Sequence, residues 1–280
     1  MTASDFSVHV EQLLVTFGST IYNVNVRTFE PVKAIGTVVF FHAFDGNGRD
    51  FQAQASYLAM TNYRVICPDM LGRGGSAFVV PPHVYTLKFI VESAAAVLAR
   101  YATGDCVIVA DEWGGVIALL AASLARTRVT HWVCADLTLD YRVEDDPAIA
   151  RALQNSGQRF EATEQALLAV AGSETVARSL QQERLIHRLR VANGQLLPHY
   201  DDAIVNQIDV FRNRSDDLRP QLRALKGKLL LTYSVYANMQ QAVALCREAP
   251  ERRAVVHGRP TAPTEVSPTA TQSLIAFIES

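Results

Sequence analysis

The sequence predicts an α/β protein with a mostly parallel, doubly wound sheet and an inserted helical cap. Three observations predict this fold class. Apolar, β-branched runs alternate with helical stretches along most of the chain, as in sheets that are buried on both faces. One such run, Val107–Ala110, breaks at a short polar turn and resumes as a helix of small residues. Between Asp136 and about Arg219 the strand pattern gives way to helical segments rich in Glu, Gln and Arg.

The sheet is expected to begin with a hairpin, because His9–Phe17 and Thr20–Thr28 alternate apolar with polar residues around Gly18-Ser19. Buried strands of β-branched and aromatic residues follow at Thr37–Phe41, Tyr63–Cys67, Cys106–Ala110, Thr130–Ala135, Lys228–Tyr233 and Arg253–His257. The helices expected between and after them are Asn47–Met60, Leu87–Tyr101, Val116–Leu124, Asn238–Glu248 and Thr269–Ile278. Ligands are expected at the carboxyl ends of such parallel strands.

The cap is predicted at residues 137–219, and residues 1–136 and 220–280 are predicted to form the core. Its expected helices are Asp146–Asn155, Glu161–Ala171 and Thr175–Val191, with a turn at Asn193-Gly194. The paired carboxylates Asp145-Asp146 and Asp201-Asp202 are interpreted as residues that begin helices rather than as metal ligands.

Composition excludes several kinds of partner. The 280 residues carry 26 basic and 28 acidic side chains, a formal net charge of −2, without a basic run that could follow a nucleic-acid backbone. The sequence contains no signal-peptide pattern and no apolar run approaching the roughly 18 residues of a membrane span. We therefore expect a soluble, cytoplasmic protein that binds a small molecule but neither nucleic acid nor membrane, and a homodimer stays open.

Cysteines and short motifs give no sign of a metal or a cofactor. Cys67, Cys106 and Cys134 lie in or beside apolar strands without CxxC spacing, which favours buried free thiols. The chain contains no phosphate-binding loop, dinucleotide fingerprint or metal-ligand spacing. We expect neither a cofactor nor a metal site.

The turn after Val107–Ala110 has the outline of a nucleophile elbow, the sharp strand-to-helix turn that exposes a nucleophile in G-x-S-x-G sequences. Residues 107 to 115 read V-I-V-A-D-E-W-G-G. Ala110 and Gly114 fill the two flanking positions where small residues are needed. The position of the nucleophile itself holds Glu112, so a carboxylate stands where a hydroxyl is usual.

Several motifs in the same order resemble the α/β-hydrolase superfamily, in particular its cap-containing esterases, dehalogenases and epoxide hydrolases. The resemblance spans nearly the whole chain and implies an α/β-hydrolase fold. It rests on the oxyanion loop at His42-Ala43-Phe44, the D-x-x-G-x-G-x-S loop at Asp69–Ser76, the elbow at Ala110–Gly115, the segment His199–Ile204 and the Thr261–Thr264 counterpart of the family's H-A-P-T. Asp136 matches a position that carries the triad acid in some members.

Departures from this pattern leave the catalytic triad degenerate. In the family, Ser attacks, His accepts its proton and an acid orients the His. Here the Ser position is Glu112, the His position is Thr261, and the usual acid position falls near Ala237, although Asp136 could serve instead. Triad hydrolysis of an ester is therefore not expected.

Glu112 itself admits three roles. Followed by Trp113, it resembles the Asp-Trp-Gly-Gly elbow of relatives with a carboxylate nucleophile, but Glu is one methylene longer and the base for the second step is missing. It could instead act as a general acid or base, or plug the site by accepting hydrogen bonds from backbone N–H groups. Burial and the charges of Asp45 or Asp136 would raise the pKa of Glu112, whereas the following helix N-terminus would lower it.

The remaining candidates surround Glu112. His257, at the end of the last strand, could replace the missing base, and Asp136 could partner the carboxylate. The N–H groups of Phe44 and Trp113 would stabilise negative charge. Arg73 is expected to hold its own loop or to clamp an anionic substrate at the cleft edge. Residues expected to order the oxyanion loop or line the pocket are His42, Ala43, Asp45 and Thr261.

Two functions follow from these residues. One is an atypical, cofactor-free hydrolase or lyase that uses Glu112 as acid or base on a small organic molecule. The alternative is a catalytically silent pseudoenzyme that keeps the pocket to bind a ligand or an active relative.

Overall fold

A computed structural model describes residues 5–81, 84–142, 146–171, 185–206, 215–233, 236–257 and 268–280. Its centre is an eight-stranded sheet with the strand order β1-β2-β4-β3-β5-β6-β11-β12. Strands β1 and β2 pair antiparallel, as do β2 and β4, and all other neighbours are parallel. The strands are β1 (Phe6–Phe17), β2 (Thr20–Pro31), β3 (Gly36–Phe41), β4 (Tyr63–Pro68), β5 (Cys106–Asp111), β6 (Val129–Ala135), β11 (Lys228–Tyr233) and β12 (Arg253–His257). This architecture confirms the predicted mostly parallel sheet.

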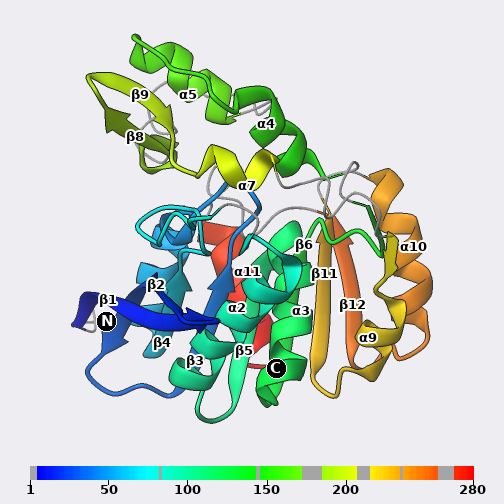
Figure 1. Ribbon diagram of the computed structural model, residues 1–280. Coiled ribbons are helices and arrows are strands. Elements are labelled where there is room, and N and C mark those ends of the chain that lie inside the picture. Colours follow the sequence, from blue (N-terminus) through cyan, green and yellow to red (C-terminus); the bar gives the residue numbers. More distant parts are fainter. Residues whose placement is uncertain are drawn as a thin grey trace.

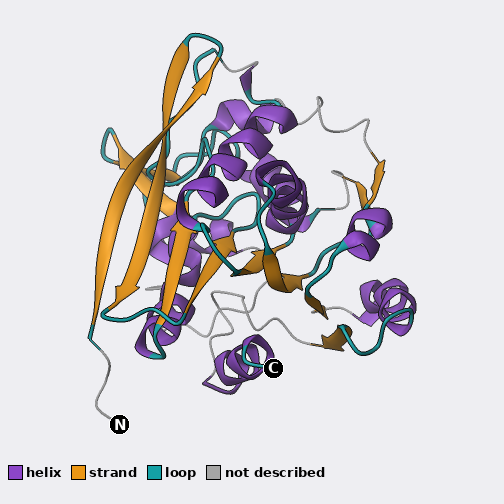
Figure 2. Ribbon diagram, turned by 90° about the horizontal axis from the view of Figure 1, so that it is seen from below, coloured by secondary structure: helices purple, strands orange, loops and turns teal. Residues whose placement is uncertain are grey.

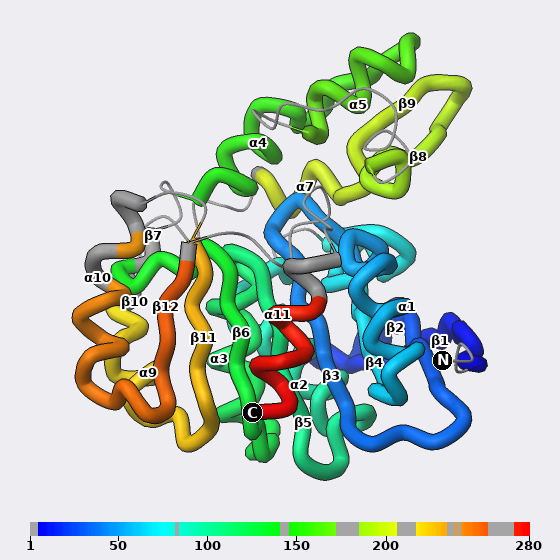
Figure 3. Tube along the Cα trace, turned by 180° about the vertical axis from the view of Figure 1, so that it is seen from behind, coloured from blue at the N-terminus to red at the C-terminus, as the bar shows by residue number. Residues whose placement is uncertain are grey.

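Helices cover both faces of the sheet (Figures 1 and 3). One face packs against α2 (Leu87–Tyr101), α3 (Trp113–Ala125) and α10 (Tyr236–Arg247), and the other against α1 (Gln52–Met60) and α11 (Pro268–Ile278). The short 3-10 helix η1 (Gly48–Phe51) precedes α1, and α9 (Arg219–Ala224) precedes β11.

The central strands show why the apolar runs in the sequence are continuous. In β3, Val38 and Phe40 pack in the cluster beneath α1 and α11, while Val39 and Phe41 pack in the cluster beneath α2 and α3. All four side chains are fully buried. A strand with a helical layer on each face has no solvent-facing side and needs no polar alternation.

The segment between β6 and β11 lies beyond the carboxyl ends of the parallel strands (Figure 1). Its base is a two-stranded ladder of β7 (Asp140–Arg142) with β10 (Ser215–Asp217). Above it lie α4 (Pro147–Asn155), α5 (Thr163–Ala171), α7 (Asp202–Asn206) and the hairpin of β8 (Leu189–Ala192) with β9 (Gln195–Pro198). The cap therefore lies over the carboxyl ends of the parallel strands, where the elbow is also found.

One of the predicted cap helices is wrong at β8. The predicted helix Thr175–Val191 overlaps this strand, and residues 172–184 lie outside the described part of the chain. Asn193 and Gly194 have positive φ values of 52° and 75°, which suits a tight two-residue hairpin turn. The predicted turn thus pairs two strands instead of ending a helix.

Three smaller expectations concern the cysteines, the hairpin and the membrane. All four cysteines are free and buried, as predicted, and burial raises the pKa of the Cys106 and Cys134 thiols to about 12. The β1–β2 hairpin is longer than predicted and flanks the rest of the sheet near the N-terminus (Figure 2).

Across the described ranges, every helix is too short or too polar to cross a membrane.

Candidate functional site

The elbow joins β5 to α3, and its tip is Glu112. This residue has φ 48° and ψ −119°, a conformation that costs a non-glycine residue on the order of 1–3 kcal/mol. Its N–H donates to the carbonyl oxygen of Ala135, at the end of neighbouring β6, over 2.8 Å. Gly114 permits the turn, since a Cβ atom there would collide with the carbonyl oxygens of Phe41 and His42. The predicted need for a small residue at this flank thus has a direct steric cause.

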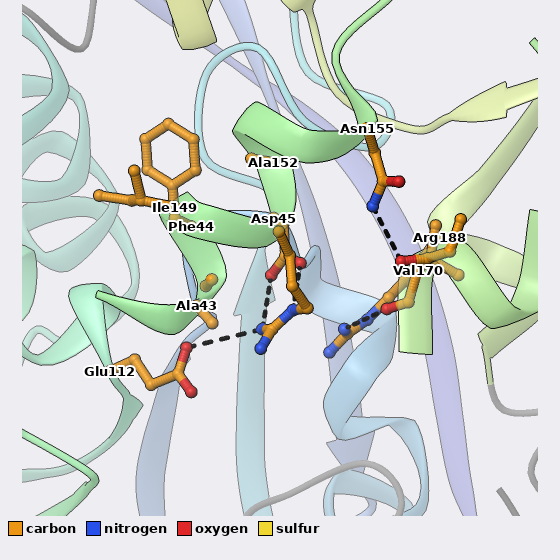
Figure 4. A network of polar contacts seen from close by, with 12 residues as sticks. Ala43, Phe44, Asp45, Glu112, Ile149, Ala152, Asn155, Val170 and Arg188 are labelled. Carbon is orange, nitrogen blue, oxygen red and sulfur yellow. Dashed lines mark hydrogen bonds and ion pairs between the residues drawn. The ribbon is translucent and has the colours of Figure 1, made fainter. Parts of the chain in front are cut away.

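The Glu112 side chain is 4% exposed and faces a charged residue of the cap (Figure 4). Its Oε2 lies 3.7 Å from Nη2 of Arg151, which belongs to α4. The same guanidinium donates to both carboxylate oxygens of Asp45, through Nε over 2.9 Å and through Nη2 over 3.1 Å. Arg151 thus bridges two carboxylates of the core from above, and its charge favours the ionised form of Glu112.

Sequence reasoning did not identify Arg151, although its position carries a signal. Ala148 and Asn155 are buried, and Arg151 lies on their helix face, three residues after the first and four before the second. Asp146 begins this helix as predicted, because its Oδ1 accepts hydrogen bonds from the N–H groups of Ala148 and Ile149. A cation within the apolar face of a cap helix is the feature that could have drawn attention.

His42 holds the oxyanion loop, as the resemblance implies. Its Nε2 accepts the N–H of Met70 over 2.9 Å, so its Nδ1 carries the proton and donates to the carbonyl oxygen of Ala43 over 2.7 Å. Burial lowers the pKa of His42 despite that second hydrogen bond, which keeps the ring neutral. Both ring nitrogens of His42 are thus engaged by backbone groups of the loops that follow β3 and β4.

Arg73 lies beneath the site rather than at its edge. It is fully buried, its Nε donates to the carbonyl oxygen of Phe44 over 2.8 Å, and its guanidinium lies over the rings of Phe44 and Trp113 at 4.3 and 4.8 Å. The Phe44 and Trp113 rings meet edge to face with centroids 5.4 Å apart. The Nη1 of Arg73 donates to the carbonyl oxygen of Leu71 over 2.9 Å, which agrees with the expectation that Arg73 holds its own loop, whereas its burial does not fit the alternative of a substrate clamp at the cleft edge. It holds the two residues whose N–H groups were predicted to stabilise negative charge.

The pairing of the strands shows which of the two predicted partners of Glu112, Asp136 or His257, lies nearer to the elbow. Asp111 is level with Ala135 on β6, Ala135 with Thr232 on β11, and Thr232 with Val256 on β12. Asp136 therefore follows the strand beside β5, roughly 4.8 Å away, whereas His257 ends a strand three spacings away, roughly 14 Å. Asp136 is half-buried, with its N–H bonded to the carbonyl oxygen of Thr232 over 2.7 Å. Thr261 lies outside the described residues.

A second set of charges binds the cap to the core beside this site. Asp50 in η1 is hydrogen-bonded by His187 Nε2 over 2.5 Å and by Arg188 through two contacts of 3.0 Å. All three residues are buried. Burial alone would raise the pKa of Asp50, but the charge of Arg188 and the bond from His187 hold it well below its usual range. These three residues were not predicted, because 137 and 138 positions separate Asp50 from its partners.

Comparison with known proteins supports the resemblance. A family model described as alpha/beta hydrolase fold matches residues 36–241. A 3-hydroxybutyrate-oligomer hydrolase of Cupriavidus necator is 30% identical over 100 residues, which are 36% of this chain and 34% of that protein. Epoxide hydrolase 3 of Siraitia grosvenorii is 29% identical over 90 residues, 31% of this chain and 28% of the relative. The matched segments thus span about a third of these relatives.

Solved structures match over the whole chain. An alpha/beta hydrolase from Novosphingobium aromaticivorans superposes with a TM-score of 0.76 at 20% identity, covering 99% of both chains. E-2-(Acetamidomethylene)succinate hydrolase gives a TM-score of 0.73 at 22% identity, covering 97% of this chain and all of the other. At these identities the likeness establishes the fold alone.

Proposed function

Since the chain belongs to the alpha/beta hydrolase fold family, we propose that it binds a small organic molecule under the cap and that Glu112 acts on this molecule as a general base and acid, without a cofactor. One observation carries the proposal. A carboxylate occupies the strained elbow tip, buried and ion-paired to the cap through Arg151. Strained backbone persists where the surrounding structure enforces it, and such positions cluster at functional sites.

A base is favoured over a nucleophile for two reasons. An ester formed on Glu112 would need an activated water to cleave it, and His257 ends a strand three spacings from the elbow. Glu112 is also one methylene longer than the Asp of relatives with a carboxylate nucleophile, which displaces its oxygens from the geometry that attack requires. Direct attack by water avoids the covalent intermediate.

The proposed hydrolysis proceeds in two steps. Glu112 takes a proton from a water molecule while the water oxygen bonds to the substrate carbonyl carbon, and the negative charge moves to the carbonyl oxygen. The N–H groups of Phe44 and Trp113 would stabilise that oxygen, and Asp136 would favour protonation of Glu112 by its nearby negative charge. The intermediate then collapses, the bond to the leaving group breaks, and Glu112 returns the proton to that group.

The test is a panel of esters, lactones, epoxides and haloalkanes on the wild type and Glu112→Gln. Loss of the general base is expected to lower kcat/KM by about 10²–10⁴-fold. Glu30→Gln is the matched control, because Glu30 is half-exposed and paired with Arg64 at the sheet, and it should leave rates unchanged. Equal rates for wild type and Glu112→Gln would remove Glu112 from the mechanism.

A silent binding protein is the second candidate, and the ion pair with Arg151 favours it because the charge of the elbow carboxylate already has a partner within the chain. It predicts ligands that raise the thermal stability of the protein without any turnover. In either case Glu112→Ser should not create an efficient esterase, since the base is still missing. A burst of ester cleavage by that variant would show that a histidine reaches the elbow.

A further inference from the structure

The edge strand β1 lacks most of the features that normally protect the edge of a sheet. It is the terminal strand of the order, and its twelve residues pair with β2 in one uninterrupted register, without a bulge. It contains no Lys, Arg or Pro. Natural edge strands use short length, bulges, prolines and lysines to prevent pairing with another chain. The opposite edge strand, β12, has only five residues and begins with Arg253.

One face of this edge exposes several apolar side chains, with the amide of Gln12 among them. Val8, Val10 and Leu14 are 46%, 52% and 66% exposed, and Ile21 on β2 adds 62% on the same face. The other face of β1 is partly covered by α2, where Phe17 packs against Phe89 and Tyr101 donates to Glu11.

The hairpin geometry fixes which backbone groups of β1 are available. Phe17 pairs with Thr20 across a two-residue turn, so the odd-numbered residues of β1 direct their N–H and C=O groups towards β2. The even-numbered residues, Val10 and Gln12 among them, direct theirs outwards. These outward N–H and C=O groups are placed to form hydrogen bonds with an antiparallel strand of another chain.

Charges select the partner and its register. The titratable side chains of β1 are His9 and Glu11, two positions apart. If Val10 pairs with Val10 of a second copy, His9 of each copy lies opposite Glu11 of the other. A shift of the two-fold axis by one residue breaks both His9–Glu11 pairs, and a shift to Glu11 also opposes two carboxylates, which is unfavourable in directly opposed pairs. β1 is thus self-complementary in one central register.

We propose that two copies of this chain associate through antiparallel pairing of their β1 strands, with the two-fold axis at Val10, so that the two sheets become continuous. Phe6 then lies opposite Leu14, and Val8 opposite Gln12, which covers part of the apolar face. This surface lies at the edge of the sheet remote from the elbow, so the inference stands or falls independently of the proposed function.

Site-specific crosslinking tests the register. The native cysteines are all buried, so Val10→Cys introduces an exposed thiol. Directly opposed residues bring their Cα atoms to roughly 5.5 Å, within disulfide reach, so oxidation should yield a covalent dimer. Ser7→Cys is the matched control, because Ser7 and its copy would lie roughly 20 Å apart and should not crosslink. Equal crosslinking of both variants, or of neither, would overturn the register.

Sedimentation of the full chain tests the association itself. The wild type is expected to be dimeric, and Val10→Lys, which opposes two cations at the axis, to raise the dissociation constant by about tenfold or more. Ile35→Lys, at a 63% exposed position outside β1, should stay dimeric. His9→Glu should weaken the dimer, and His9→Glu with Glu11→Lys should restore it. A monomeric wild type, or a dimer indifferent to the His9 and Glu11 exchanges, would contradict the proposal.

Discussion

Different forces hold the elbow at the bottom of the site, here called the floor, and the cap above it, here called the roof. The floor is the elbow between β5 and α3, where Ala110 is fully buried and Gly114 lets the helix approach the carbonyl groups of β3. The roof is attached by a partly buried pair, Arg151 with Asp45, and a buried pair, Arg188 with Asp50, across 106 and 138 positions of sequence. Local steric fit fixes the position of Glu112, whereas long-range ion pairs fix what lies above it.

The largest effect should come from breaking the roof. Asp50→Asn leaves the buried Arg188 without its charged partner, and removing one member of a buried ion pair costs about 3–5 kcal/mol. The free energy of unfolding from urea titration at neutral pH should fall by that amount. A loss comparable to that of an exposed pair, about 0–1 kcal/mol, would mean that the cap is held by apolar packing instead.

The same pair predicts a pH dependence. Because the folded-state pKa of Asp50 is lowered, its contribution is fully present above the unfolded value of about 3.9 and is lost as the pH falls through the lower folded value. The stability difference between wild type and Asp50→Asn should therefore be constant near neutrality and shrink below about pH 4. A difference that instead changes between pH 6 and 8 would contradict the assignment of the pH dependence to Asp50.

The stability of the elbow should depend on side-chain volume rather than on charge. Gly114→Ala places a methyl group against the carbonyl oxygens of Phe41 and His42 and should cost about 1–3 kcal/mol. Gly104→Ala is its control, because a Cβ atom at Gly104 meets nothing within 4 Å. Equal melting temperatures for the two variants would show that the elbow relaxes without cost.

The smallest effect should come from a charged contact at the base of the cap that is open to water. Arg219 donates to Asp140 and Asp217, whose side chains are about half exposed. Arg219→Gln should change the free energy of unfolding by less than about 1 kcal/mol. A larger loss of stability would mean that exposed ion pairs at the base of the cap also attach it to the core. The elbow and the cap would then differ less than proposed.

This contrast also explains what the sequence could predict. Strand runs such as that of β3 and the small residue at Gly114 depend on local pattern, and the structure agrees with both. The cap itself was predicted, but the contacts that attach it to the core were not. Arg151, His187 and Arg188 pair with residues far away in the chain, and no local pattern reveals such pairs. The strand β8 was missed because the Asn193-Gly194 turn was recognised without the hairpin that it closes.

The most direct test of the central claim follows the oxygen of water. Turnover of a hydrolysed substrate in H₂¹⁸O should place the label in the product and leave the peptide that contains Glu112 unlabelled, because water attacks the substrate itself. Incorporation of ¹⁸O into the Glu112 carboxylate would show a covalent ester intermediate and contradict the assignment of Glu112 as a general base.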